Sequence, residues 1–156
     1  MNEVLAFDPG KVIGYAHFEN GEFQSSIELQ SLEEIVKQFQ CVLNSPLTVE
    51  ERNLVCITET FSRGNTAVKD QLQTIEIIGA IRALCLVHEV PLIEQLPSMR
   101  TGYIPIAKAM IRENGYTLKE KHHSIDAIAH GLAYMDKGGV EWHKRYWMSK
   151  AFQQGA

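Results

Sequence analysis

Four residues of this 156-residue chain have the types and the spacing to hold metal ions together. Asp8 and Glu59 each follow a short apolar run, and His123 precedes Asp126 by three positions. Three carboxylates that share one site raise one another's pKa, so they need a positive counter-ion. Oxygen ligands with one imidazole suit Mg²⁺ or Mn²⁺. Two such ions about 3.5–4 Å apart can support in-line displacement at a phosphodiester.

The apolar runs at residues 4–7 and 54–57 predict the buried strands that would position the first two carboxylates. If these strands are adjacent and parallel, Asp8 and Glu59 emerge at the same edge of the sheet. Taken one at a time, such residues are more often turn, cap or solvated positions. Only their combination points to chemistry.

A helix is predicted over residues 122–135, and it would carry His123 and Asp126 on one face because they are three positions apart. Small residues would let this helix approach the sheet closely; they are Ala127, Ala129 and Ala133. His130 lies four positions after Asp126. It could orient Asp126, but we expect a solvated histidine.

The remaining pattern predicts a mixed α/β protein. Asn20-Gly21 lies between strand-like runs and predicts a hairpin, and Ser31 with Glu34 forms a capping box. Further elements are expected as helices over 32–43, 65–88 and 105–114, a strand over 90–93, and a short helix or arm over 141–154. The order βββαβαβαα indicates a mixed sheet covered by helices. No Gly-x-Gly-x-x-Gly follows the first strand, which excludes a doubly wound dinucleotide fold.

Composition indicates one globular domain: the chain is 45% apolar and 22% charged. No apolar stretch reaches the ~20 residues of a membrane helix, and no export signal is recognisable at the N-terminus, so we expect a cytoplasmic protein without membrane contact. The cysteines are expected to be buried thiols; they are Cys41, Cys56 and Cys85.

Taken alone, a net charge of −4 disfavours a nucleic-acid partner, but the charge is unevenly distributed along the chain. Residues 1–97 hold 6 basic and 14 acidic residues, whereas residues 98–156 hold 9 basic and 5 acidic ones. The distribution is compatible with an acidic site beside a basic surface.

The combined pattern resembles the RuvC-type Holliday junction resolvases of the RNase H-like superfamily. Residues 6–10 (Ala-Phe-Asp-Pro-Gly), with Gly14 four positions on, are similar to their first motif. Residues 57–61 (Ile-Thr-Glu-Thr-Phe) look like their fourth-strand glutamate with a following aromatic. Residues 123–129 (His-Ser-Ile-Asp-Ala-Ile-Ala) look like their C-terminal helix motif. The sequence diverges enough to favour a phage-encoded or otherwise specialised member.

The resemblance implies a mixed five-stranded sheet, with the first three strands antiparallel, flanked by helices. It implies that Asp8 bridges two Mg²⁺, that Glu59 binds one of them, and that His123 with Asp126 binds the other. Mn²⁺ is expected to substitute, since imidazole is a softer ligand than carboxylate. It also implies a homodimer, joined through the helix over 65–88, that nicks opposed strands of a four-way DNA junction. The nuclease domain is expected over 1–138, with 139–156 as an aromatic and basic tail or short helix of the same domain.

Several residues are candidates for DNA contact. Phe61 could stack on an unpaired base or fill the core. The other candidates are polar or basic, and they are Arg63, Asn65, Lys69, Arg100, Lys108, Lys119 and Lys121. The aromatic and basic tail could contact DNA too, but we favour its packing on the body.

Three other functions fit parts of the pattern. A related nuclease could act on flaps, branched DNA or structured RNA. A non-catalytic junction-binding protein could keep the fold without the activity, although the intact carboxylates argue against it. A nucleotide-phosphate binder of the actin-like superfamily would need a much longer chain.

Overall fold

The computed structural model describes residues 1–61 and 68–155. Within them lies one five-stranded sheet with the strand order β3-β2-β1-β4-β5. The strands are β1 (Glu3–Asp8), β2 (Ile13–Glu19), β3 (Glu22–Leu29), β4 (Leu54–Glu59) and β5 (Leu92–Gln95). Strands β1, β2 and β3 pair antiparallel, whereas β1, β4 and β5 run parallel. This is the predicted mixed sheet with three antiparallel strands first.

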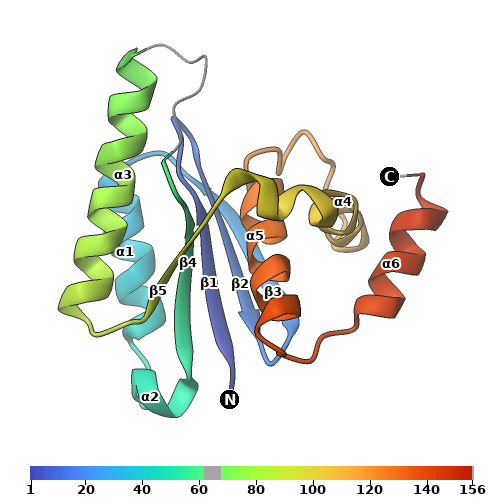
Figure 1. The fold of residues 1–156 in the computed structure, drawn as a ribbon, viewed down its shortest axis with the longest axis horizontal. Coiled ribbons are helices and arrows are strands. Elements are labelled where there is room, and N and C mark those ends of the chain that lie inside the picture. Colours follow the sequence, from blue (N-terminus) through green and yellow to red (C-terminus); the bar gives the residue numbers. More distant parts are fainter. Residues whose placement is uncertain (62–67, 156) are drawn as a thin grey trace.

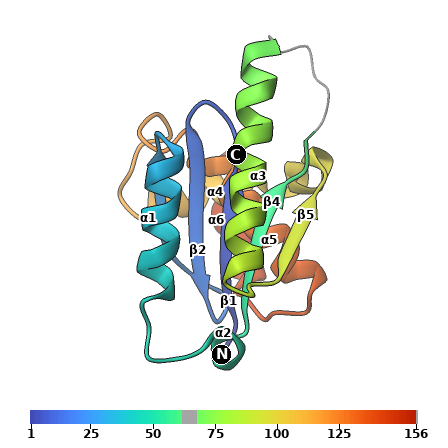
Figure 2. The same ribbon diagram turned by 90° about the vertical axis from the view of Figure 1, so that its left-hand side faces the viewer.

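Helices cover both faces of the sheet (Figure 1). The helical elements are α1 (Leu32–Leu43), α2 (Val49–Arg52), α3 (Val68–Val87), the 3-10 helix η1 (Pro97–Tyr103), α4 (Ile104–Glu113), α5 (Ser124–Lys137) and α6 (Lys144–Gln153). Helices α1 and α3 lie side by side on one face, as Figure 2 shows, and α4 and α5 lie on the other. No helix in this part of the chain is long and apolar enough to cross a membrane.

Each face of the sheet has its own apolar core, because successive side chains of a strand point to opposite faces. Val4 and Ala6 of β1 pack towards α4 and α5, whereas Leu5 and Phe7 pack towards α1 and α3. A strand buried on both sides has no polar positions to alternate with the apolar ones. This explains the uninterrupted apolar run before Asp8.

The hairpin between β2 and β3 turns at Asn20 and Gly21, which both have positive φ angles of 51° and 79°. Two successive positive φ angles match the twist of the flanking strands, and Asn-Gly adopts them at low cost. The predicted capping box is only half formed: the Ser31 side chain accepts a hydrogen bond from the Glu34 amide, but the Glu34 carboxylate accepts from the Gln30 amide instead of the Ser31 amide.

Some sequence-based expectations need correction. Cys41 is exposed on α1, so only Cys56 and Cys85 are the buried thiols expected of all three. The last strand covers Leu92–Gln95 rather than 90–93, because polar side chains are tolerated on this edge strand. The short elements α2 and η1 were not predicted, since four to seven residues carry too little periodicity.

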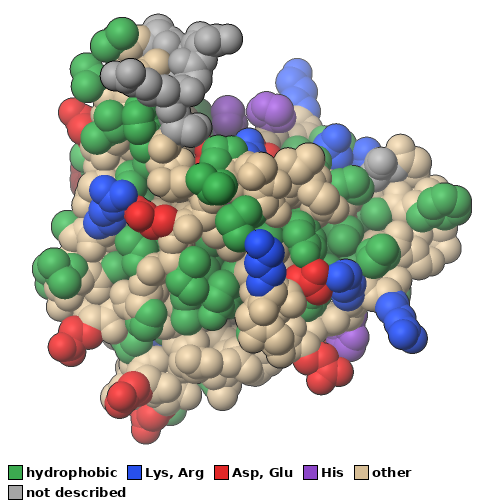
Figure 3. All heavy atoms as spheres, in the orientation of Figure 1, with side chains coloured by type: hydrophobic (Ala, Val, Ile, Leu, Met, Phe, Trp, Pro, Cys, Tyr) green, Lys and Arg blue, Asp and Glu red, His purple; other side chains and the backbone are tan. Residues whose placement is uncertain are grey.

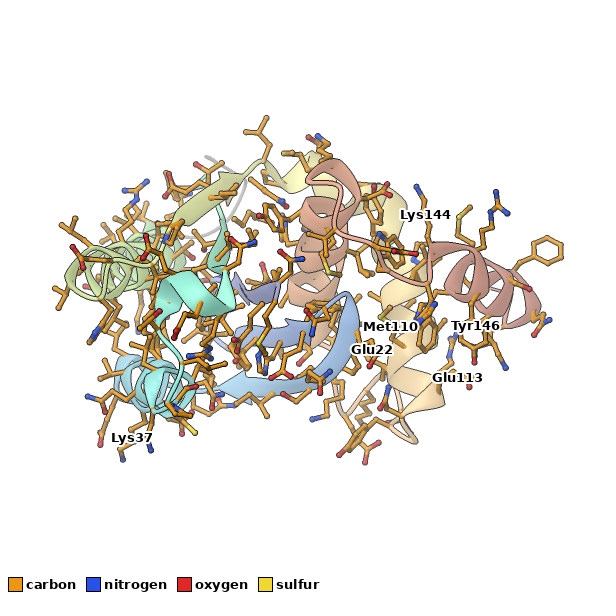
Figure 4. All side chains as sticks on the ribbon, turned by 90° about the horizontal axis from the view of Figure 1, so that it is seen from below. Glu22, Lys37, Met110, Glu113, Lys144 and Tyr146 are labelled. Carbon is orange, nitrogen blue, oxygen red and sulfur yellow. The ribbon has the colours of Figure 1, made fainter. Side chains whose placement is uncertain are left out.

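The C-terminal helix α6 lies along α4, as Figure 4 shows from below with Tyr146 of α6 and Glu113 of α4 labelled. Trp142, just before α6, is buried with its ring 6.5 Å from that of Tyr103. Basic side chains of the tail also form ion pairs with the body: Lys144 with Asp136, and Lys150 with Glu113. These contacts favour packing over a free DNA-binding arm. The division at residue 138 stays a prediction.

A buried ion pair fixes the start of β1, at the end of the sheet opposite to Asp8. The Glu3 carboxylate accepts hydrogen bonds from Arg52 Nε at 2.6 Å and Nη2 at 2.7 Å. Its Oε1 also lies 2.7 Å from His17 Nε2. Burial raises the pKa of Glu3, but Arg52 and His17 outweigh it and lower the pKa overall.

We therefore expect Glu3→Gln to destabilise the protein by about 3 kcal/mol at pH 7, because it leaves the Arg52 guanidinium buried without a counter-charge. Urea unfolding measures this change. The difference in unfolding free energy between Glu3→Gln and wild type should shrink as the pH falls below 4.5. The Glu3 carboxyl is protonated there first in the unfolded chain and then, at its lowered pKa, in the folded protein. Replacing the pair by Glu3→Leu with Arg52→Met should recover most of the loss. Equal stability of Glu3→Gln and wild type at pH 7 would show that the Glu3–Arg52 ion pair does not stabilise the fold.

Candidate active site

The first two predicted carboxylates lie on neighbouring parallel strands. Phe7 of β1 pairs with Thr58 of β4, so the residues that follow, Asp8 and Glu59, end these strands side by side. Both strands end at the upper edge of the sheet in Figure 1, where η1 and the start of α5 also lie. The sequence prediction that one sheet edge carries both side chains is confirmed.

Helix α5 brings the other two predicted residues to this edge. Its alanines at the sheet interface are buried: Ala127, Ala129 and Ala133 are fully inaccessible to solvent. Gly14 of β2 allows the closest approach, because a Cβ at this position would lie 1.8 Å from the His123 carbonyl oxygen. Any larger residue would push the start of α5 away from Asp8, which pairs with Gly14 in the β1–β2 ladder.

Hydrogen bonds from the edge strand β3 hold the start of α5 in place. The His123 amide donates to Glu28 Oε1 at 3.0 Å, and Ser124 Oγ donates to the Ile27 carbonyl at 3.3 Å. His123 itself immediately precedes the helix. The site is therefore positioned by the antiparallel half of the sheet as well as by the parallel half.

A single hollow, the site hollow, contains three of the four predicted ligands. It is lined by Asp8, Ile104, Lys108, Leu118, His122, His123, Ile125 and Asp126. Figure 3 shows histidine side chains at the corresponding upper edge of the molecule, with basic side chains next to them. The arrangement places carboxylates, imidazoles and a lysine around one solvent-accessible space.

Arg100 connects Glu59 to this group. Its Nη1 lies 2.9 Å from Glu59 Oε2, and its Nε lies 3.1 Å from Asp126 Oδ2. Nη1 also donates to the Pro97 carbonyl at 2.7 Å, within η1. Sequence reasoning listed Arg100 only among residues for DNA contact. Its position between two carboxylates depends on the unpredicted 3-10 helix.

His130 is the second residue whose role the sequence did not indicate. We expected a solvated histidine, but it is fully buried, and this expectation is wrong. Its Nε2 lies 2.9 Å from Glu59 Oε2, and its Nδ1 lies 2.7 Å from Gln95 Oε1. Helix α5 thus presents His130 to Glu59 one turn after Asp126. Gln95 ends β5, and the edge rule that selected Asp8 and Glu59 could have selected it too.

The electrostatics of the site match its crowding. Burial raises the pKa of Asp8 to about 8, with further contributions from Asp126 and Glu59, while Arg100 acts in the opposite direction. A carboxyl with so high a pKa has too little positive charge around it. Such perturbed groups in a hollow are typical of functional sites.

The donor set fits a hard divalent cation. Carboxylate oxygens with one imidazole are ligands that Mg²⁺ and Mn²⁺ accept, and a dication would supply the charge that Asp8 lacks. Among the described residues, one group has ligand atoms that all lie within 4.8 Å of one another, and it is a different one: Glu3 with His17 and Glu19. The carboxylate of Glu3 is already bonded to Arg52 at both oxygens, so this group fits a metal poorly.

The remaining predicted DNA contacts divide into several cases. Phe61 is partly exposed just after β4, Lys69 is exposed on the first turn of α3, and Lys119 is exposed after α4. Lys121 instead donates to the Ser26 carbonyl at 2.9 Å and lies over the Tyr116 ring. The other two candidates, Arg63 and Asn65, lie outside the described residues.

The sheet order, the flanking helices and the carboxylate edge define an RNase H-like α/β fold. In particular, the fold is RuvC-like. The chain is similar to Thermus thermophilus RuvC solved with a Holliday junction substrate, with a TM-score of 0.61 and 15% identity over 90% of this chain and 98% of that one. It is also similar to another Thermus thermophilus RuvC structure, with a TM-score of 0.51 and 15% identity over 88% and 97%. No protein-family model and no curated protein matches the chain.

The raised pKa of Asp8 predicts how the metal-free protein responds to pH. Folding disfavours the charged carboxylate, so the penalty is absent below pH 3.8, grows as the pH rises, and is complete above about 8. We expect Asp8→Asn in EDTA to melt at a higher temperature than wild type at pH 8.5. The gap should close as the pH is lowered towards 3.8, and saturating Mg²⁺ should narrow it at pH 8.5. If Asp8→Asn melts no higher than wild type throughout this range, Asp8 does not carry an unfavourable buried charge, and the raised pKa is wrong.

Proposed function

We propose that this protein is a metal-dependent, structure-specific endonuclease that resolves four-way DNA junctions by paired nicks. One observation carries the proposal. Asp8, His123 and Asp126 line one hollow, and Glu59 joins them through Arg100, at the carboxyl edge of a RuvC-like sheet. The fold match supports a nuclease scaffold, and the side chains supply ligands for divalent cations.

In the proposed mechanism, Asp8, Glu59, His123 and Asp126 hold two Mg²⁺, for which Mn²⁺ can substitute. When bound, these ions supply the Lewis acidity that activates water and offsets charge at the phosphate. The chain itself sets the geometry: β1 and β4 fix the first two carboxylates, and α5 fixes the other two ligands. His130 holds Glu59 from the buried side. Hydrolysis would leave 5′-phosphate and 3′-hydroxyl ends.

Basic side chains around the hollow are proposed to bind the DNA backbone. Lys108 lines the hollow directly, Arg100 lies beside it, and Lys119 is exposed on the segment between α4 and α5. Phosphate contacts would position the junction, and its branched shape would provide the selectivity. Phe61 and Lys69 remain candidate contacts from the other side of the site.

We also propose that the protein acts as a homodimer joined through α3. A row of α3 residues at alternating steps of four and three faces solvent: Val68, Leu72, Ile75, Gly79, Arg82 and Leu86. This row is not part of the core, which α3 contacts through Ile77, Ile81 and Cys85. Leu72 is 57% exposed and Leu86 81% exposed, so the monomer leaves apolar surface unburied.

Gly79 in the middle of this row supports a close helix–helix contact. A glycine inside a helix costs about 1 kcal/mol relative to alanine, and a Cβ at this position would meet no described residue of the monomer within 4 Å. The monomer therefore gives no reason for glycine here. A second helix packed against this face would give one.

Leu72→Glu should convert the dimer to monomer, because it places a charge in the apolar contact. Sedimentation velocity over a range of concentrations measures the change. Lys69→Glu, which changes charge on the same helix outside the row, is the matched control and should remain dimeric. Wild-type protein that is monomeric at high micromolar concentration would refute the proposed interface.

The nuclease proposal predicts symmetrical paired nicks in a labelled four-way junction with Mg²⁺ or Mn²⁺, and none with EDTA. Asp8→Asn should lower the cleavage rate at least about a hundredfold and keep junction affinity within a few-fold, because it removes a ligand and leaves the basic surface intact. Glu33→Gln, which changes an exposed carboxylate on α1 outside the site, is the comparison variant. Cleavage of flaps or structured RNA without paired nicks would point to a related nuclease. Binding without cleavage in either metal would point to a non-catalytic junction binder.

A further inference from the structure

We infer that Arg100 is a built-in counter-ion that occupies the cation position between Glu59 and Asp126 and must leave it when metal binds. This inference rests on the proposed metal site. The guanidinium contacts one carboxylate on β4 and another on α5, at 2.9 Å and 3.1 Å. It therefore offsets the charge of two proposed ligands that come from different elements, as the bound dications would.

The two partners of Glu59 differ in their freedom to move. Its Oε2 lies 2.9 Å from both His130 Nε2 and Arg100 Nη1. His130 is fully buried in α5 and is held on its other side by Gln95, so it cannot withdraw without unpacking the core. Arg100 lies on the solvent side, with its side chain 24% exposed. Of the two, only Arg100 can exchange with an incoming ion.

Exchange is required by charge as well as by space. An arginine side chain stays protonated in proteins, so it cannot lose its charge when a dication arrives. A guanidinium held by these two carboxylates and the dications bound to the same carboxylates would repel each other in a partly buried site.

The position of Arg100 in the chain suits this exchange. It belongs to η1, a 3-10 helix of seven residues, rather than to the sheet or α5. Arg100 also donates a hydrogen bond to the Pro97 carbonyl of the same helix. This hydrogen bond can persist when the guanidinium moves away from the two carboxylates. Once released, the guanidinium would be free to bind a phosphate at the edge of the site, for which its planar fork is well suited.

The test is the binding of Mn²⁺ alone to the metal-stripped, DNA-free full chain, measured by calorimetry or by electron paramagnetic resonance of free Mn²⁺. Arg100→Ala removes the two ion pairs that compete with the incoming ion, so the affinity of the site for Mn²⁺ should rise. We expect this variant to bind Mn²⁺ at least about tenfold more tightly than wild type. Arg100→Lys, which keeps the charge without the fork, should give an intermediate value.

Lys108→Ala is the matched control, because Lys108 lines the same hollow but forms no ion pair with the site carboxylates among the described residues. It should change Mn²⁺ affinity less than about threefold, because its charge is not paired with the ligand carboxylates. An equal effect of both variants would show a general charge effect and overturn the assignment. Unchanged or weaker Mn²⁺ binding by Arg100→Ala would also overturn it, because Arg100 would then be a support for the site.

Two additions keep the result interpretable. If Arg100→Ala folds poorly without metal, Arg100→Gln replaces it, and its Mn²⁺-induced rise in melting temperature should exceed that of wild type. Asp126→Asn should weaken Mn²⁺ binding both in the wild-type protein and in the Arg100→Ala variant. If Asp126→Asn binds like wild type, or if neither wild type nor Arg100→Ala binds Mn²⁺, the metal site itself is wrong and the inference falls with it. If wild type and Arg100→Ala bind Mn²⁺ equally well through Asp126, only the role of Arg100 is refuted.

Discussion

The contact between α5 and the β1–β2 hairpin determines whether the proposed metal ligands of this protein can meet at one site. Gly14 lies opposite Asp8 in the hairpin and directly below the His123 carbonyl. On the same interface, a Cβ at Gly131 would lie 2.4 Å from the ring of Phe18. Without side chains at these two positions, the helix can lie close enough to the sheet for His123 and Asp126 to reach Asp8. The backbone approach is therefore as important to the chemistry as the ligands are.

The close approach has an electrostatic cost, and the surrounding residues divide the task of offsetting it. Asp8 is left with a pKa of about 8, whereas Glu59 receives two donors and Asp126 one. The donors to Glu59 differ: one is buried and fixed, and the other is attached to a short helix at the surface. A site that must accept cations cannot be fully neutralised by its own side chains, since it would then have no affinity left for the ions. Stability is given up where function needs unpaired charge.

The four proposed ligands could be found from sequence because each follows a local rule. Asp8 and Glu59 end apolar runs, and His123 and Asp126 share the start of a periodic helix, so strand ends and helical spacing were enough to group them. The hairpin followed from an equally local signal, Asn20-Gly21, whereas the antiparallel pairing of the first three strands came from the family resemblance. The contacts of His130 and Arg100 could not be predicted from local rules.

A histidine four positions after Asp126 can face solvent or core, and only the packing of α5 against β4 and β5 decides between them. The contacts of Arg100 depend on η1, whose course is set by tertiary structure. Cys41 shows the same limit, because an apolar neighbourhood in sequence did not make its side chain buried.

The pairing of Asp8 with Gly14 limits where this chain can lengthen. Only residues 9–13 connect the two, and the register fixes Asp8 opposite Gly14. An insertion there would keep the site intact only if the added residues left this pairing unchanged. The segment between α1 and α2 is not paired across the sheet in this way, and it lies at the opposite end of the sheet. Variation in length is thus expected to be tolerated more readily between α1 and α2 than between β1 and β2, so that the scaffold can acquire new surface features without disturbing its proposed metal ligands.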